Sequence, residues 1–277
     1  MSPESIAQPI LIALTVFGVL SFVKRSSKQE AKVVNWSPSE AISVTVAIYF
    51  ISQFVIALGL SMIVSITNMN EADIEQVFES SPAGQFGYIL ALEAITIGLL
   101  YLFMRRRKTP WALIGWVKPK VKDIWYALTG FGIYFVVYAV IVAQIVEQYL
   151  PIDTNQKQEL GFSTSTAGPE LIFIFLSLVI LPPLIEEILV RGFLFTGLKT
   201  KLSFIPAAII TSIIFGAAHL QWGGDAPLLW TAAIDTFVLS MVLVYLRHRS
   251  GSLWPGIGLH FIKNGIAFLA LFVFKVV

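Results

Sequence analysis

Long apolar stretches recur along the whole chain and constrain its fold more than any other feature. A helix needs roughly 20 consecutive apolar residues to cross about 30 Å of hydrocarbon. Eight stretches come near that length, approximately at residues 6–23, 41–66, 86–104, 124–146, 171–191, 204–220, 228–246 and 253–274. Only 13% of the 277 residues are charged, against about 25% in an ordinary soluble domain. We therefore predict an all-α membrane protein, folded as a single bundle of about eight transmembrane helices.

Lysine and arginine residues fall in every second connection between the predicted spans. The connections after the first, third, fifth and seventh spans hold fifteen of the nineteen basic residues. Cytosolic loops of membrane proteins collect Lys and Arg, so we predict that these loops are cytosolic and that both termini are non-cytosolic. The first apolar run is followed by Lys24 and Arg25, whereas a signal peptide carries positive charge before its apolar core. We therefore expect an uncleaved first span.

The absence of cysteine and the distribution of charge exclude several classes of function. A chain without cysteine has no disulfide, no thiolate nucleophile and no thiolate metal ligand. Its charges come in blocks, with no basic face interleaved with aromatic residues, so we expect no nucleic-acid partner. The spans follow one another closely, without a repeat or a low-complexity linker. We predict one polytopic membrane domain over residues 1–277.

Ionisable residues within the predicted spans gather in the C-terminal half. Such groups are costly in a membrane helix, so they should be paired or functional. The set comprises Glu186, Glu187 and Arg191 in the fifth span, His219 near the end of the sixth, Asp235 in the seventh, and His260, Lys263 and Asn264 in the eighth. Glu93 stands apart in the third span, where a polar contact within the bundle is its default role. His248, between two arginines, is predicted to be a solvated loop residue.

Helical spacing separates the paired acid of the fifth span from the unpaired one. Glu187 and Arg191 are four residues apart with the acid first, which favours an ion pair. Glu186 is rotated by about 100° from Glu187, so it is free to point at a neighbouring helix. Pro182 and Pro183 directly before it should kink or interrupt the span.

Residue spacing also predicts which polar residues of the later spans share a helix face and which lie at the same depth in the membrane. His260 and Asn264, four residues apart, should project from one face of the eighth span. Counting residues from the turn between the fifth and sixth spans places Glu186 and His219 at the same depth. Asp235 and Lys263 lie at nearly equal height and are expected to form an intramembrane ion pair, although Lys263 could instead meet a substrate carboxylate.

A cluster of one carboxyl, two imidazoles and one amide permits a specific chemistry. Glu186 and His219 could hold a water molecule and deprotonate it as it attacks a carbonyl. His260 and Asn264 could donate hydrogen bonds to the developing oxyanion. Hydrolysis of an amide is the natural reaction of such a site. The same Glu and two His could instead bind zinc; their spacing is not that of H-E-x-x-H and leaves the choice open.

Three ordered motifs resemble those of the CPBP family, also called Abi or CAAX prenyl protease-like intramembrane glutamic or metallo endopeptidases. Glu186-Glu187-Ile-Leu-Val-Arg191-Gly192 matches E-E-x-x-x-R-G, and Phe215-Gly-Ala-Ala-His219 matches F-x-x-x-H. His260-Phe-Ile-Lys-Asn264 matches H-x-x-x-N. The resemblance implies a catalytic core over residues 171–270, with residues 1–150 supplying additional membrane helices.

The resemblance also implies an activity and roles for the motif residues. The protein would be an intramembrane endopeptidase that hydrolyses a peptide bond of a membrane-associated peptide or protein, prenylated or simply hydrophobic. Glu186 and His219 would activate water, His260 and Asn264 would form the oxyanion site, and Glu187 with Arg191 would support the fold. Either no cofactor is required, or a divalent metal such as zinc is held by Glu186, His219 and His260.

Two other functions fit the same residues. A non-catalytic membrane partner, such as an immunity protein, would keep the motifs for folding. A transporter or proton pathway would use the same acids and histidines, but it should show repeats in both halves of the chain, and the ionisable residues here crowd one half. For the protease we expect membrane lipid and a hydrophobic or lipidated peptide as partners, in a multi-pass protein of the plasma membrane.

Overall fold

The computed structural model describes residues 34–74, 77, 81–153, 160–163, 166–221 and 228–276. Over these ranges all regular structure is helical, without a strand. Six helices are long and apolar enough to cross a membrane: Pro38–Thr67, Pro82–Arg106, Val121–Tyr149, Gly168–Leu198, Trp230–Ser250 and Trp254–Val273. The protein is thus an all-helical, multi-pass membrane protein, as predicted.

The predicted count of about eight spans is not confirmed. The first predicted span, residues 6–23, lies outside the described residues. The sixth corresponds to α10 (Phe204–Ala217), which has 14 residues. At 1.5 Å per residue such a helix is shorter than the hydrocarbon core.

Local sequence signals set the beginnings and ends of several helices. α2 (Pro38–Thr67) begins with a capping box in which Ser37 and Glu40 satisfy each other's backbone N–H groups. Ser81 caps α4 (Pro82–Arg106) through the backbone N–H of Gly84. α11 (Trp230–Ser250) ends at Gly251, whose φ of +71° is the left-handed conformation that suits glycine. The chain then turns directly into α12 (Trp254–Phe268), which continues as the π-helical segment η7 (Leu269–Val273).

The span that carries the first motif is one helical run with two π-helical segments. After the 3-10 turn η4 (Gly168–Glu170) it consists of α7 (Leu171–Phe175), η5 (Leu176–Ile180), α8 (Leu181–Glu186), η6 (Glu187–Leu194) and α9 (Phe195–Leu198). Pro182 and Pro183 lie between the two π-helical segments. The two prolines do not end the helix. Before and after them the backbone hydrogen bonds span five residues, as in a π-helix, in place of the four of an α-helix.

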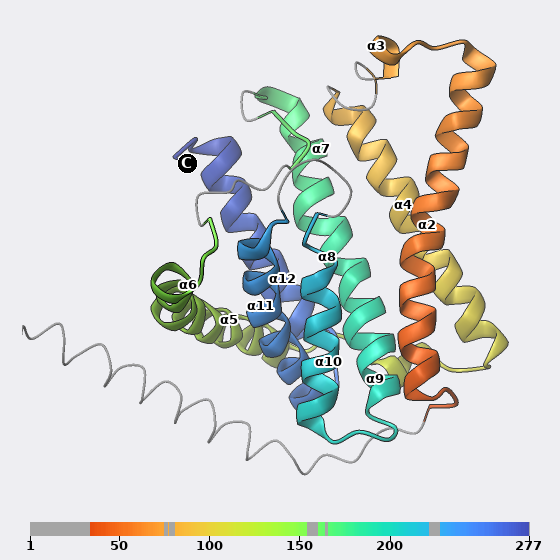
Figure 1. The fold of residues 1–277 in the computed structure, drawn as a ribbon. Coiled ribbons are helices and arrows are strands. Elements are labelled where there is room, and N and C mark those ends of the chain that lie inside the picture. The colour runs from red at the N-terminus through yellow and green to blue at the C-terminus, as the bar shows by residue number, and fades with distance from the viewer. Residues whose placement is uncertain are drawn as a thin grey trace, which may run out of the picture.

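The motif helices form the centre of the bundle (Figure 1). α10 packs along α11, and α12 packs along α5 (Val121–Val136), which continues through η3 (Val137–Val142) into α6 (Ala143–Tyr149). α2 and α4 lie together on the other side of α8 and α9. The polar residues of the motifs are therefore enclosed by helices from both halves of the chain.

The segment before α2 packs into this centre. The indole of Trp36, only 3% exposed, stacks on Phe193 with ring centroids 4.8 Å apart and meets Phe103 edge-on at 6.0 Å. Gly197 of α9 leaves room for the indole, since a Cβ atom there would overlap Trp36 and Ala41. The N-terminal helices are thus joined to the motif helices by a shared core.

The connection between α4 and α5 is fixed to the last two helices. It contains the 3-10 helix η2 (Trp111–Ile114) and Gly115, whose φ is +93°. The Gly115 carbonyl accepts from the Leu253 N–H at 3.0 Å, and the Trp254 indole N–H donates to the Val117 carbonyl at 2.6 Å. The guanidinium of Arg247 packs against Gly115, where any Cβ atom would clash with it.

The prediction that His248 is a solvated loop residue is wrong. α11 continues to Ser250, beyond the predicted end at residue 246, so Arg247 and His248 belong to its last turns. Both are buried, and the His248 ring stacks on Phe204 at 4.7 Å. The adjacent arginines suggested solvent, but this end of α11 is covered by α9, α10 and the α4–α5 connection.

Candidate active site

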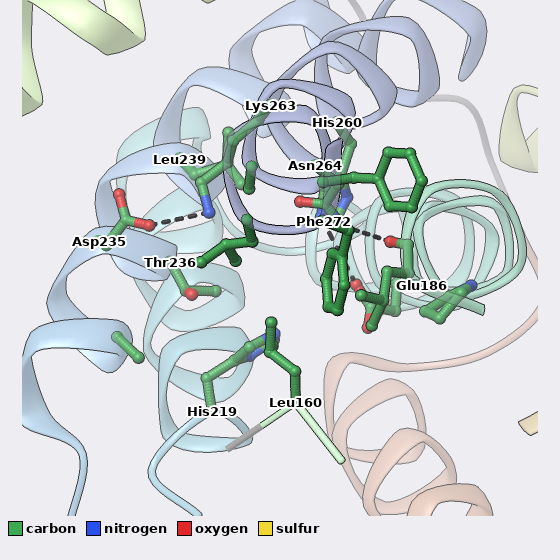
Figure 2. Close-up of a pocket in the computed structure, with 16 residues that line it drawn as sticks. Leu160, Glu186, His219, Asp235, Thr236, Leu239, His260, Lys263, Asn264 and Phe272 are labelled. Carbon is green, nitrogen blue, oxygen red and sulfur yellow. Dashed lines mark hydrogen bonds and ion pairs between the residues drawn. The ribbon is translucent and has the colours of Figure 1, made fainter. Parts of the chain in front are cut away.

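One cavity of about 220 Å³ brings the predicted site residues together. Its polar lining consists of Glu186, His219, Asp235, Thr236, His260, Lys263 and Asn264, and apolar side chains complete the wall. Figure 2 shows Glu186 and His260 at one end, the Asp235–Lys263 pair at the other, and His219 below. Four segments far apart in sequence, α8, the end of α10, α11 and α12, thus meet around one space.

Glu186 is the last residue of α8 and faces α12. Its Oε2 lies 3.9 Å from Nε2 of His260, and its side chain is 29% exposed. Glu187, the next residue, is fully buried. The rotation of about 100° between successive helical residues explains why two adjacent acids have different surroundings.

Glu187 and Arg191 form the predicted ion pair. Oε1 of Glu187 accepts from Nη1 of Arg191 at 2.8 Å, and both side chains are removed from solvent. The guanidinium also lies over the ring of Phe215, 4.1 Å from its centroid, a cation–π contact. Arg191 thereby links the first motif to the phenylalanine that begins the second.

The same Glu187 oxygen also faces His260, a contact that the sequence analysis missed. Nδ1 of His260 lies 3.4 Å from Oε1 of Glu187. With Nδ1 turned toward the Glu187–Arg191 pair, Nε2 is the nitrogen that faces Glu186. The predicted ion pair with Arg191 already accounted for a carboxylate within this span. Nothing in the sequence therefore pointed to a second neighbour of Glu187 on another helix.

His219 follows the last turn of α10 and is oriented by that helix. Its Nδ1 lies 2.8 Å from the carbonyl oxygen of Phe215. Because a carbonyl only accepts hydrogen bonds, this contact places a proton on Nδ1, and in the neutral ring Nε2 then carries the lone pair. In the described part of the chain no hydrogen bond or ion pair joins His219 to Glu186; the two side chains share the cavity.

Asn264 lines the cavity one turn after His260, as the H-x-x-x-N spacing predicts. Its Nδ2 donates to the carbonyl oxygen of Leu178 at 2.8 Å. One amide hydrogen is thus used by the fifth span, and one remains for the cavity.

Asp235 and Lys263 form the predicted intramembrane ion pair, with Nζ of Lys263 2.9 Å from Oδ2 of Asp235. The other oxygen of Asp235 accepts a hydrogen bond from the Tyr134 hydroxyl on α5. These contacts link three helices at this end of the cavity.

Glu93 on α4 does not line the cavity, and within the described residues it has neither a hydrogen bond nor an ion pair.

The donor atoms do not converge as a three-ligand metal site would require. Among the described residues, no group of three or more His, Cys, Asp or Glu side chains is arranged to hold an ion. Nδ1 of His260 faces Glu187 and Nδ1 of His219 faces a carbonyl, which leaves one nitrogen of each ring for the cavity. One outward-facing nitrogen on each ring is also how histidines bind zinc, so the zinc set of Glu186, His219 and His260 stays a prediction.

These features define a membrane protein with a polar, titratable site enclosed by its helices. Residues 168–266 match the family described as Rce1-like, "Type II CAAX prenyl endopeptidase Rce1-like", which confirms the resemblance carried by the three motifs. The match contains all three of them. This is a protease family, so peptidase activity is supported at the level of the family.

One curated relative is similar to part of the chain. The chain is 34% identical over 94 residues to an "Uncharacterized 24.3 kDa protein" of Escherichia coli, an alignment that covers 33% of this chain and 41% of that protein. The chain thus spans less than half the length of that relative. No solved structure matches the chain significantly.

Proposed function

We propose that this protein is an intramembrane endopeptidase that hydrolyses a peptide bond of a hydrophobic or lipidated peptide at the membrane. The observation that carries the proposal is the meeting of Glu186, His219, His260 and Asn264 around one cavity. A general base and oxyanion donors are the two components that amide hydrolysis needs most.

Glu186 and His219 activate water in this proposal. The lone pair on Nε2 of His219 accepts one water hydrogen and orients the molecule, while Glu186 takes the other proton as the water oxygen attacks the peptide carbonyl. The protonated Glu186 then gives that proton to the amide nitrogen as the C–N bond breaks. The products are a carboxylic acid, which keeps the second water hydrogen, and an amine, and Glu186 returns to its starting state.

His260 and Asn264 stabilise the tetrahedral intermediate. For this role Nε2 of His260 must carry a proton, since only an N–H can donate to the developing oxyanion. The second amide hydrogen of Asn264 is the other donor. Hydrogen bonds in an enclosed, water-poor site are stronger than in bulk water. The Glu187–Arg191 pair acts indirectly, since it borders the other side of the His260 ring.

The experiment compares two glutamates of the same membrane domain. Purified protein in lipid nanodiscs is incubated with a library of hydrophobic peptides, with and without a prenyl group, and products are identified by mass spectrometry. Glu186→Gln should lower the rate of cleavage by about 10²- to 10⁴-fold, whereas Glu147→Gln, which is exposed and outside the cavity, should retain it. Unchanged cleavage in Glu186→Gln would remove the proposal. Absence of any cleavage by the unaltered protein would favour the non-catalytic partner.

Orientation in the membrane can be tested directly because the chain has no cysteine. Figure 1 places the start of α2, the end of α4 and the α9–α10 connection at one end of the bundle, and α3 (Glu71–Ile74) at the other. We propose that the first end, which carries the basic loops, faces the cytosol of a plasma membrane. In intact cells, an impermeant maleimide should label Asn68→Cys and not Lys118→Cys; both positions are exposed. The reverse pattern would invert the orientation.

A further inference from the structure

The carbonyl group of Leu178 occupies an unusual position in the fifth span. In an α-helix a carbonyl accepts from the N–H four residues later, and in a π-helix from the N–H five residues later. For Leu178 these are residues 182 and 183, and both are prolines without an N–H. The Leu178 carbonyl therefore has no donor within its own helix in either geometry.

A side chain of the proposed site supplies the missing donor. Nδ2 of Asn264 donates to the Leu178 oxygen at 2.8 Å across the gap between the two spans. An unpaired backbone carbonyl inside a bilayer is costly, so this bond is favoured over leaving the acceptor free. It also fixes the plane of the amide, because both Nδ2 hydrogens and the side-chain oxygen lie in that plane.

We infer that the Pro182-Pro183 pair positions Asn264 for the reaction by keeping the Leu178 carbonyl free to accept from it. The prolines touch no reacting atom in this role; they act as positioning residues through one backbone oxygen. The inference rests on the proposed function for its catalytic consequence, while its structural part, the orientation of the Asn264 amide, stands independently.

The kinetic test uses a variant in which residues 182 and 183 again have backbone N–H groups. The variant Pro182→Ala/Pro183→Ala returns both N–H groups, one of which should take the Leu178 oxygen from Asn264. We expect kcat to fall about tenfold or more, within the range of about 10²- to 10³-fold for complete loss of an oxyanion donor, with little change in KM. In an Asn264→Ala background the proline replacement should cause no further fall. Equal falls in both backgrounds would overturn the inference.

A matched control separates this effect from general changes in helix stability. Pro206 is the third residue of α10 and is exposed. N–H groups in the first turn of a helix have no intrahelical acceptor, so Pro206→Ala should leave kcat unchanged. If the double alanine variant does not fold, Pro182→Ala and Pro183→Ala are tested singly, since each restores one of the two donors.

A spectroscopic readout tests the orientation of Asn264 without any substrate. The chain contains five asparagines, so selective ¹⁵N labelling gives few side-chain amide signals, and Asn264→Ala identifies the signal of interest. One Asn264 amide proton should be shifted downfield by its bond to Leu178, and this shift should shrink in Pro182→Ala/Pro183→Ala but not in Pro206→Ala. An unchanged signal would refute the inference even if cleavage is observed. A changed signal without cleavage by the unaltered protein would refute only the proposed function.

Discussion

Nδ1 of His260 lies 3.4 Å from Oε1 of Glu187, the same oxygen that accepts from Arg191 at 2.8 Å. A buried ion pair on the fifth span therefore borders the histidine of the eighth. Charges that are removed from water depend strongly on their partners. The orientation of the His260 ring should accordingly be sensitive to changes that do not touch the cavity.

Loss of the buried arginine should destabilise the protein. Arg191→Met retains much of the side-chain volume but leaves the Glu187 carboxylate without its cation, a change that typically costs about 3–5 kcal/mol. Arg107→Met is the matched control, because Arg107 pairs with Glu40 at the surface, where both side chains are 39% exposed. Thermal unfolding in detergent should show a large decrease in Tm for Arg191→Met and a small one for Arg107→Met. Equal decreases would show that the Glu187–Arg191 pair has no special role.

A methyl group at position 256 should disturb the same pair from the other side. A Cβ atom on Gly256 would lie 2.7 Å from Oε2 of Glu187, so the carboxylate must shift relative to His260. A displacement of this kind can lower a catalytic rate on the order of 10²-fold, and we expect such a loss of cleavage in Gly256→Ala. Gly265→Ala on the same helix is the control, since its Cβ would lie 3.8 Å from Val179. Similar activities of the two variants would contradict the prediction.

The Asp235–Lys263 pair should show energetic coupling. Asp235→Asn leaves Lys263 without an anion, and Lys263→Met leaves Asp235 with only the Tyr134 hydroxyl among its described partners. Residues in direct contact typically couple by about 0.5–3 kcal/mol, so the double variant should be less destabilised than the sum of the single variants. Unfolding by SDS titration in mixed micelles measures the three free energies. Simple additivity would mean that the ion pair contributes nothing to the stability of the bundle.

Cleavage should survive the removal of divalent metal. The cavity residues, as placed, do not form a three-ligand set, and the proposed reaction uses only Glu186, His219, His260 and Asn264. Protein treated with a chelator and passed through a desalting column should retain its rate, and elemental analysis should find far less than one metal ion per molecule. Loss of activity that zinc restores would show that the side chains rearrange around an ion.

Features that depend on short-range spacing were predictable from the sequence. The Glu187–Arg191 pair follows from the i, i+4 rule, and the Asp235–Lys263 pair follows from counting residues to a hairpin turn. Apolar length located most of the described spans within a few residues. The helix that holds residues 204–217 is the exception, because hydropathy cannot distinguish a short buried helix from the end of a complete span.

Features that depend on how helices are rotated and enclosed were not predictable. The contact between Glu187 and His260 requires the relative rotation of the fifth and eighth spans, which hydropathy does not give. The bond from Asn264 to the Leu178 carbonyl requires a backbone acceptor that only the prolines release. His248 was misplaced because charged neighbours predict solvent, whereas its ring packs on Phe204.

The stacking of Trp36 on Phe193 has a consequence for how this protein can be divided. The matched family region begins at residue 168, but part of its interior surface is filled by an indole more than a hundred positions upstream. A fragment that starts after residue 150 would lack Trp36 and would expose the apolar surface around Phe193 and Gly197. The half that carries the three motifs therefore depends on the N-terminal segment for part of its core. Moving it into another membrane protein would require an aromatic side chain there to replace Trp36.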